Sequence, residues 1–191
     1  HIGKHLVIKP SWEKYDTKAD DLVIEIDPGM AFGTGTHHTT SMCMEYLEEI
    51  ITPQADVFDV GTGSGILSIA AAKLGAKSIV AVDIDANAVR IAKENIAGNG
   101  LSEVIAVKEG DLLHGTEGKA DVIIANIIAD IIIMLLPDVA QKLKADGKFL
   151  ASGIIEERED DIKQAAAASG LKVISTRHKG GWVAMLMALE D

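Results

Sequence analysis

Short runs of apolar and β-branched residues alternate with longer helical patterns from residue 55 onward. Seven runs predict strands, at Val57–Val60, Ser78–Asp83, Val104–Val107, Asp121–Asn126, Lys148–Ser152, Leu171–Thr176 and Trp182–Leu189. Helical spacing of apolar residues predicts helices near 65–74, 86–97, 128–144 and 156–169, with a longer loop around 108–119 in place of one helix. This alternation predicts right-handed crossovers and a mostly parallel sheet with helices on both faces, a doubly wound α/β fold.

The C-terminal end breaks the alternation. Between Leu171–Thr176 and Trp182–Leu189 there is no room for a crossover helix, which needs a dozen or more residues. The connection contains the pair Gly180-Gly181, which is typical of a tight hairpin turn. We therefore expect a seven-stranded sheet that is mostly parallel and has an antiparallel last strand.

Residues 1–54 show a different pattern from the rest of the chain. The segments His5–Lys9 and Leu22–Asp27 are candidate strands joined by a polar loop, and we expect them to form a hairpin. A stretch rich in glycine and threonine then leads into a helix from about Thr39 to Ile51. We expect this N-terminal part to pack on a core formed by residues 55–191.

The composition is that of a folded globular chain. Of 191 residues, 48% are hydrophobic and 25% are charged, which fits one domain with a single large core. The single cysteine, Cys43, excludes an internal disulfide and fits a reducing compartment. No secretion signal is visible, and the longest apolar run, Ile127–Leu136, is too short to span a membrane. We expect a cytoplasmic protein without a membrane partner.

The formal net charge is −11, which bears on the choice of partner. Proteins that bind nucleic acids gather lysine and arginine on one face, so we expect no direct nucleic-acid partner. A negative charge suits a basic protein substrate through long-range attraction, although many enzymes are acidic for solubility alone.

The segment Asp59–Gly65, which reads Asp-Val-Gly-Thr-Gly-Ser-Gly, ends one predicted strand and begins a helix. Glycines let a backbone turn sharply and approach a ligand, and the N-terminus of a helix presents free N–H groups to an anion. The next strand ends at Asp83, where an acid accepts hydrogen bonds from ribose hydroxyls, and Ile84 follows. A glycine loop alone can be only a tight turn, but this order of elements favours a nucleotide-type ligand.

The spacing of the glycines distinguishes two kinds of nucleotide. The dinucleotide pattern G-x-G-x-x-G would place its third glycine at position 66, where this chain has Ile66 after Gly65. The observed G-x-G-x-G resembles the first motif of class I S-adenosylmethionine-dependent methyltransferases, whose fold is Rossmann-like. The expected antiparallel final hairpin is also typical of that class.

Two further polar residues follow predicted strands. Asp111 comes after the third strand of the core, where it would meet an adenine amino group or lie in solvent as a loop carboxylate. Asn126 ends the fourth, at the edge where doubly wound sheets hold their ligands, or it ties down a turn.

Five segments resemble the PrmA family of methyltransferases, which modify ribosomal protein eleven of the large subunit. The most specific runs from Ile26 to Thr40 and contains Phe-Gly-Thr-Gly-Thr-His, which general class I enzymes lack. The others follow in the family's order: Asp59–Leu67, Val82–Asp85, Ala125–Asp130 and Ser152–Ile154. The resemblance covers essentially the whole chain, but it places the first residues where the family's catalytic part begins. We therefore expect the family's N-terminal recognition domain to be absent.

The resemblance implies an enzyme that transfers methyl groups from S-adenosylmethionine to lysine side chains and an N-terminal amine of that ribosomal protein. Phe32, Gly33 and His37 would lie along the cofactor and substrate entrance, and we take Asn126, Phe32 and His37 as candidate catalytic residues. The expected cofactor-binding residues are Thr40, Gly61, Thr62, Gly63, Gly65, Asp83, Ile84, Asp111 and Asn126.

Asn126 is followed by Ile127-Ile128-Ala129, whereas many N-methyltransferases carry Asn-Pro-Pro-Tyr at this point. The family shows the same variant, which favours an amine target. The carbonyl of the Asn126 side chain would accept an N–H of the amine and orient its lone pair. Trp182 would face the sulfonium through a cation–π contact or pack in the core.

Other interpretations remain open on the sequence. Adjacent histidines such as His37 and His38 point in different directions, and no cluster of cysteine, histidine and aspartate accompanies them, so no metal is expected. The alternatives to a protein methyltransferase are a class I methyltransferase of RNA or a small molecule, a dinucleotide-binding oxidoreductase domain, and a binding module that has lost catalysis.

Overall fold

The computed structural model describes residues 2–10, 14–26 and 38–191. Its main sheet has seven strands in the order β5-β4-β3-β6-β7-β9-β8, in which β9 runs antiparallel to the other six. The strands are β3 (Asp56–Val60), β4 (Ser78–Asp83), β5 (Ile105–Glu109), β6 (Ala120–Asn126), β7 (Leu143–Ile155), β8 (Leu171–Lys179) and β9 (Trp182–Leu189). The expected fold class and sheet are confirmed.

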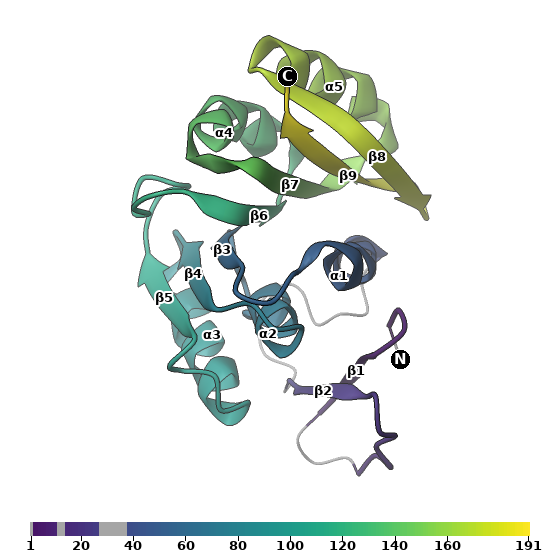
Figure 1. Cartoon of the computed structure of the whole chain (residues 1–191), viewed down its shortest axis with the longest axis vertical. Helices are drawn as coiled ribbons and strands as arrows, with labels where there is room; N and C mark the ends of the chain where they lie inside the picture. The colour runs from purple at the N-terminus through teal and green to yellow at the C-terminus, as the bar shows by residue number, and fades with distance from the viewer. Residues whose placement is uncertain (1, 11–13, 27–37) are drawn as a thin grey trace.

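Helices cover both faces of the sheet (Figure 1). One face carries α1 (His38–Ile50), α2 (Ile66–Lys73) and α3 (Ala86–Gly98), and the other carries α4 (Ala129–Lys142) and α5 (Glu159–Ala168). A short 3₁₀ turn at Glu156–Arg158 precedes α5. Fully buried side chains fill both interfaces, for example Ile69 on the first face and Leu136 on the second. No helix in the described part of the chain is long and apolar enough to cross a membrane.

A helix cap and the predicted hairpin turn order the core. Asp85 accepts a hydrogen bond from the backbone N–H of Asn87 at 2.9 Å and so caps α3. Gly180 and Gly181 join β8 to β9 with φ of +57° and +83°. Positive φ at both central residues is the signature of a type I′ hairpin turn, which L-residues with side chains rarely adopt.

A loop takes the place of a crossover helix between β5 and β6, as the pattern predicts. The side chain of Leu113 is fully buried and packs against the α4 side of the sheet. The loop is also tied to α4, because Lys142 Nζ donates to the carbonyl oxygen of Thr116 at 2.8 Å and to its hydroxyl at 3.0 Å. The loop thus covers the sheet without being helical.

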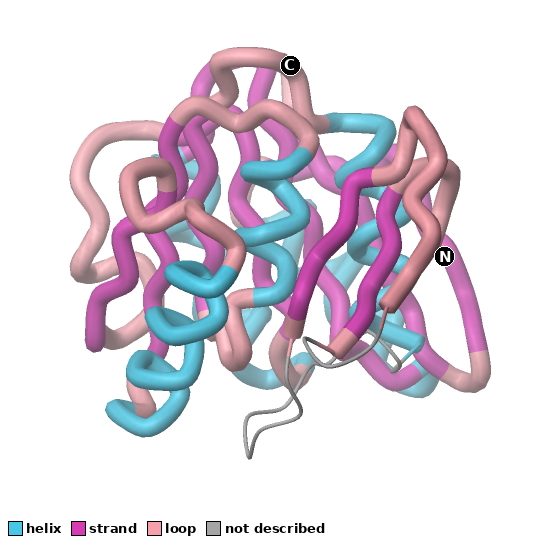
Figure 2. The backbone as a smooth tube through the Cα atoms, turned by 90° about the horizontal axis from the view of Figure 1, so that it is seen from below, coloured by secondary structure: helices cyan, strands magenta, loops and turns pink. Residues whose placement is uncertain are grey.

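The expected N-terminal hairpin is wrong. The strands β1 (Leu6–Lys9) and β2 (Leu22–Glu25) do pair, but they pair in parallel, side by side and apart from the main sheet (Figure 2). A parallel pair needs a connection long enough to carry the chain back to its starting edge. Residues 10–21 supply that length, and the polar character of the loop says nothing about its direction.

Two side chains of the core hold this small sheet in place. The carboxylate of Glu48 on α1 accepts hydrogen bonds from the backbone N–H groups of Lys4, His5 and Leu6 at 2.7, 3.0 and 3.1 Å. The side chain of Asn99, after α3, exchanges two hydrogen bonds with the backbone of Glu25. The chain therefore reaches residue 26 anchored to both α1 and α3.

Candidate functional site

A cavity of about 740 Å³ lies at the carboxyl ends of β3, β4 and β6. Doubly wound sheets hold their ligands at this edge. Eight of the nine predicted cofactor residues line the cavity together: Thr40, Gly61, Thr62, Gly63, Asp83, Ile84, Asp111 and Asn126. The ninth, Gly65, is the residue before α2, and a Cβ added there would lie 3.3 Å from the Cβ of Ala92 on α3. Gly65 thus permits close helix packing rather than forming the cavity wall.

The glycine loop turns as the sequence requires. Gly61 and Gly63 have φ of +70° and +57°, in the left-handed region that favours glycine. A Cβ at Gly61 would also lie only 2.7 Å from Cγ2 of Ile127, which comes from the end of β6. A side chain at position 61 would therefore strain the backbone and push apart two walls of the cavity.

Asp59 holds the base of the loop from inside the protein. Its side chain is buried, and one carboxylate oxygen accepts hydrogen bonds from the hydroxyls of Thr62 at 2.8 Å and Ser68 at 2.7 Å. Burial raises the pKa of Asp59 to about 6, although the two hydroxyls act in the opposite direction. Asp59 therefore links the loop to the first turn of α2 without lining the cavity.

Asp83 lies beside the loop at the end of β4. One carboxylate oxygen accepts the backbone N–H of Gly63 at 2.9 Å, and the other accepts that of Asp85 at 3.0 Å. A carboxylate has about four acceptor positions, so two remain for a ligand. The neighbouring Ile84 is 73% exposed, and it places a bare apolar side chain at the same end of the cavity.

The opposite wall of this end comes from the segment after β5. Gly110, Asp111 and Leu112 line the cavity, and the Asp111 side chain is exposed, with His114 at 3.9 Å. Leu112 has a φ of +53°, which is uncommon for a residue with a side chain. Backbone strain of this kind is concentrated at ligand sites, where the surrounding structure holds it.

Asn126 and Thr40 meet at the other end of the cavity. The Asn126 side-chain NH₂ donates to the Thr40 hydroxyl at 3.3 Å, across 86 positions of sequence. The Asn126 side-chain carbonyl oxygen is buried and has no hydrogen-bond partner among the described residues. An unsatisfied buried acceptor costs about 1–3 kcal/mol. The side chain therefore does not tie down a local turn, and its free acceptor fits a ligand N–H.

Close backbone packing positions this asparagine. The Ile127 N–H donates to the Ser152 carbonyl oxygen at 3.0 Å. A Cβ at Gly153, whose φ is +82°, would lie 2.6 Å from the Ile127 carbonyl oxygen. Trp182, at the start of β9, is half-buried, packs against the core and also lines the cavity. The expected core packing of Trp182 is thus present in part, and its contact with a sulfonium stays a prediction.

Two candidate catalytic residues, Phe32 and His37, lie outside the described residues, as does Gly33. His38 begins α1, and its ring lies against the hairpin turn, since a Cβ at Gly180 would be 2.5 Å from His38 Cδ2. Within the described residues, no three histidine, cysteine, aspartate or glutamate side chains converge as a metal site would require.

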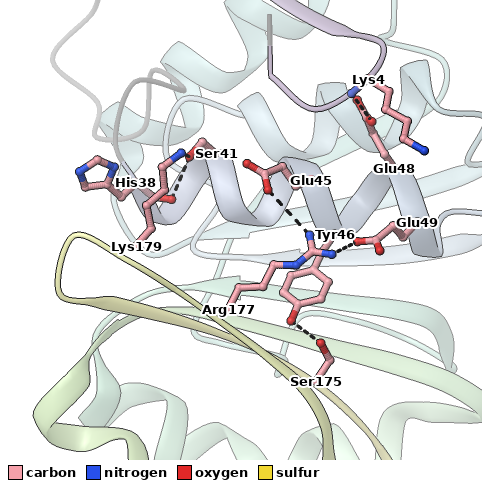
Figure 3. A network of polar contacts seen from close by, with 10 residues as sticks. All are labelled: Lys4, His38, Ser41, Glu45, Tyr46, Glu48, Glu49, Ser175, Arg177 and Lys179. Atoms are coloured by element: carbon pink, nitrogen blue, oxygen red, sulfur yellow. Dashed lines mark hydrogen bonds and ion pairs between the residues drawn. The ribbon is translucent and has the colours of Figure 1, made fainter.

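A polar network fixes α1, which carries Thr40, against the β8 strand (Figure 3). The Arg177 guanidinium lies 4.0 Å from the centroid of the Tyr46 ring and pairs with Glu49. The Tyr46 hydroxyl is 2.7 Å from the hydroxyl of Ser175. Burial raises the pKa of Tyr46, so this ring stays neutral. The network therefore also holds in place the part of the cavity wall that Thr40 forms.

Sequence reasoning missed several residues of the cavity wall, among them Thr39, Gly110, Leu112, Ile128, Ile131 and Gly153. Thr39 and Leu112 are direct neighbours of predicted residues, so adjacency was the available signal. Gly153 had a clearer signal, because it directly follows the predicted strand Lys148–Ser152 and lies within the family segment Ser152–Ile154.

Structural comparison shows the same arrangement in other proteins. A methyltransferase from Pyrococcus furiosus superposes with a TM-score of 0.73 at 19% identity, covering 87% of this chain and 89% of that one. A ribosomal protein L11 methylase from Lactobacillus delbrueckii subsp. bulgaricus superposes with a TM-score of 0.94 at 39% identity, covering 100% of this chain and 98% of that one. The first likeness shows the fold alone.

The sheet order, the antiparallel β9 and the cavity at the carboxyl edge define the class as Rossmann-like methyltransferases. The chain belongs to the ribosomal protein L11 methyltransferase (PrmA) family, whose profile matches residues 1–190. Relatives of that name from Desulfitobacterium hafniense and Caldanaerobacter subterraneus are 52% and 53% identical over 95% and 97% of this chain. The chain spans 58% and 60% of the length of these two relatives.

Proposed function

We propose that this chain binds S-adenosylmethionine and transfers its methyl group to amines of ribosomal protein L11, on lysine side chains and at the N-terminus. The family and the fold support methyl transfer. The observation that carries the choice of an amine is the buried carbonyl oxygen of Asn126 at one end of the cavity, which has no hydrogen-bond partner within the described part of the chain.

The residues of the cavity fit S-adenosylmethionine. Gly61 and Gly63 carry no side chain at the cavity wall, so the methionine part can approach the backbone of the loop closely. Asp83 keeps two acceptor positions for ribose hydroxyls, and Asp111 would accept from the adenine amino group. Ile84 and Leu112 offer apolar contacts to the adenine ring. When bound, the cofactor supplies a methyl group on a positively charged sulfur.

The acceptor end would hold the amine as the free base. Neutral pH lies about three units below the pKa of a lysine, which is ~10.4, so removing its proton costs ~4–5 kcal/mol. An N-terminal amine has a pKa of ~8, and removing its proton costs far less. Apolar surroundings disfavour the charged form, and Ile127, Ile128 and Trp182 line this part of the cavity. The Asn126 carbonyl oxygen would accept an N–H of the amine and point its lone pair toward the methyl group. Positioning of this kind is the main contribution that a protein makes to a displacement between two bound reactants.

Asn126→Ala tests this role. We expect methyl transfer to purified L11 to fall by at least about 100-fold, the size of a lost positioning and hydrogen-bonding contact, while the melting temperature changes little. The substitution removes one hydrogen bond, from the Asn126 NH₂ to the Thr40 hydroxyl, together with a carbonyl oxygen that has no partner among the described residues. Labelled methyl transfer and thermal melts are to be measured on the same sample.

Asn99→Ala is the matched control, because Asn99 anchors β2 and does not line the cavity. It should lower stability while leaving the transfer rate per folded molecule unchanged. If Asn126→Ala lowers activity only as far as it lowers the folded fraction, Asn126 is a structural residue. Transfer to RNA or to free small amines, with none to L11, would instead support a different methyltransferase.

A further inference from the structure

The outer face of α4 begins at the cavity and carries exposed apolar side chains. Ile128, just before the helix, is 64% exposed and lines the cavity, as does the half-buried Ile131. Met134 follows Ile131 by three positions, which places both on one side of the helix, and Met134 is also 64% exposed. The apolar surface therefore continues from the cavity out along the helix.

Carboxylates flank this surface at helical spacing. Asp130 and Asp138 stand four residues before and four residues after Met134, so the three side chains share a face. Asp130 pairs with Arg158 at 2.8 Å, and Asp138 lies 3.8 Å from His114. The exposed Asp111 adds a third carboxylate beside His114. The surface is apolar in the middle and has carboxylates at its edges, of which Asp130 is already paired with a cation of this chain.

We propose that this surface, the α4 ledge (Ile128, Asp130, Ile131, Met134 and Asp138), docks the segment of a basic protein substrate that flanks the reacting amine. An apolar side chain of that segment would cover Met134 and Ile131, and its cations would lie near Asp130 and Asp138. The inference rests on the proposed function and deepens it, because it assigns substrate recognition to residues outside the cofactor site.

Three observations favour a basic substrate segment as the occupant. The ledge is continuous with the cavity that holds the unpartnered Asn126 oxygen, so a chain lying on it can extend its amine inward. Acidic groups at its edges match a basic partner, and the net charge of −11 attracts one from a distance. Exposed methionine is also suited to recognition surfaces, because its flexible side chain adapts to different apolar partners.

The test uses Met134→Ser and Asp138→Asn, since neither residue lines the cavity. Ile174→Ser is the matched control, because Ile174 is 45% exposed on β8 and lies outside the ledge. Binding of fluorescently labelled L11 is measured by anisotropy at low and at raised salt, and methyl transfer is measured in parallel. We expect Met134→Ser to raise Kd and KM about tenfold, because serine offers the docked side chain no apolar surface to bury, and we expect kcat to be unchanged. Asp138→Asn should weaken binding at low salt and reduce its salt dependence, while Ile174→Ser changes neither.

The outcomes separate the two proposals. If Met134→Ser weakens L11 binding but the wild-type chain transfers no methyl group to L11, the ledge stands and the proposed function fails. If the wild-type chain methylates L11 and Met134→Ser leaves Kd and KM within twofold of wild type, the ledge is overturned. Absence of any L11 binding by the wild-type chain also overturns it. So does a dimer in sedimentation that Met134→Ser dissociates, because the occupant would then be a second copy.

Discussion

Asp59 and Asp83 lie close to the same glycine loop, yet their surroundings give them different roles. Asp59 is buried under the loop and holds two hydroxyls, whereas Asp83 binds two backbone N–H groups and keeps free acceptor positions on the cavity side. Sequence reasoning named Asp83 because it ends a strand about twenty residues after the loop. It assigned no role to Asp59, since a residue that acts by holding others leaves no spacing signal.

Asp83→Ala is expected to weaken S-adenosylmethionine binding by roughly 10- to 100-fold, because hydrogen bonds to a charged acceptor are worth ~1.5–3 kcal/mol. Part of the loss would come through the loop, since the Gly63 N–H also loses its acceptor. Titration calorimetry measures the effect, and Asp146→Ala, an exposed aspartate on β7, is the control. Unchanged affinity in a folded Asp83→Ala protein would remove Asp83 from the site.

Asp59 should make stability depend on pH in an unusual direction. Its folded pKa of about 6 lies above its ordinary value near 3.8, so the folded state binds the proton more tightly than the unfolded state. The Asp59 contribution to the free energy of unfolding therefore falls as pH rises from about 4 to 6, by ~2–3 kcal/mol. Asp59→Asn removes this term while keeping an oxygen for the two hydroxyls. In urea unfolding, the free energy of unfolding of the variant minus that of wild type should therefore increase as the pH rises over that range. A difference that is constant with pH would contradict the raised pKa.

The helices and strands of the main sheet lie where the hydrophobic pattern predicts them, but the pattern does not determine the direction in which neighbouring strands pair. The Gly180-Gly181 turn allowed only one geometry, so the β8–β9 hairpin was predictable from two residues. The β1–β2 pair had no such turn, and its two parallel strands are anchored by Glu48 and Asn99, which lie far away in sequence. Strand pairing is therefore predictable from local sequence only where a short turn constrains it.

Glu48→Ala should release β1 while leaving the main sheet intact. Burial alone would raise the pKa of Glu48, but hydrogen bonds from three backbone N–H groups outweigh it and hold this pKa below its ordinary value. In the wild-type chain, the contribution of Glu48 to the docking of β1 should accordingly be fully present at pH values above the ordinary pKa of a glutamate. It should be lost as the pH falls through the lowered pKa. Hydrogen exchange should show faster exchange at Lys4, His5 and Leu6 in the variant.

Glu49→Ala is the matched control for Glu48, because Glu49 lies on the same helix but pairs with Arg177 on β8. In the Glu49→Ala variant, the hydrogen-exchange rates of the β1 amides should equal those of wild type. Equal protection of β1 in Glu48→Ala would mean that apolar packing of residues such as Leu6 and Ile24 suffices to dock the strand.

On the scale of the whole molecule, the parts of the cavity come from distant segments. The loop after β3, the ends of β4 and β6, the start of α1 and the start of β9 all line it. Each belongs to the 191 residues of this chain, although the relatives are longer.

We therefore expect the chain to bind S-adenosylmethionine by itself. Binding to the folded state alone raises the unfolding free energy by ~2.7 kcal/mol at a ligand concentration of 100 times Kd, which thermal melts detect readily. NAD titrated in parallel should give no shift, since the glycine spacing departs from the dinucleotide pattern. A shift with NAD and none with S-adenosylmethionine would favour the oxidoreductase alternative.

The sequence alone determined the α/β class, the strand positions and the final hairpin, and it named eight residues that line the cavity together. These features depend on local periodicity, on glycines with positive φ and on acids at strand ends, all of which are short-range. Only the tertiary structure decided the parallel direction of β1 and β2, the buried position of Asp59 and the burial of an Asn126 carbonyl oxygen to which no described residue donates. Each of these depends on contacts between segments far apart in the chain, where packing and hydrogen bonding select one arrangement among several that local sequence permits.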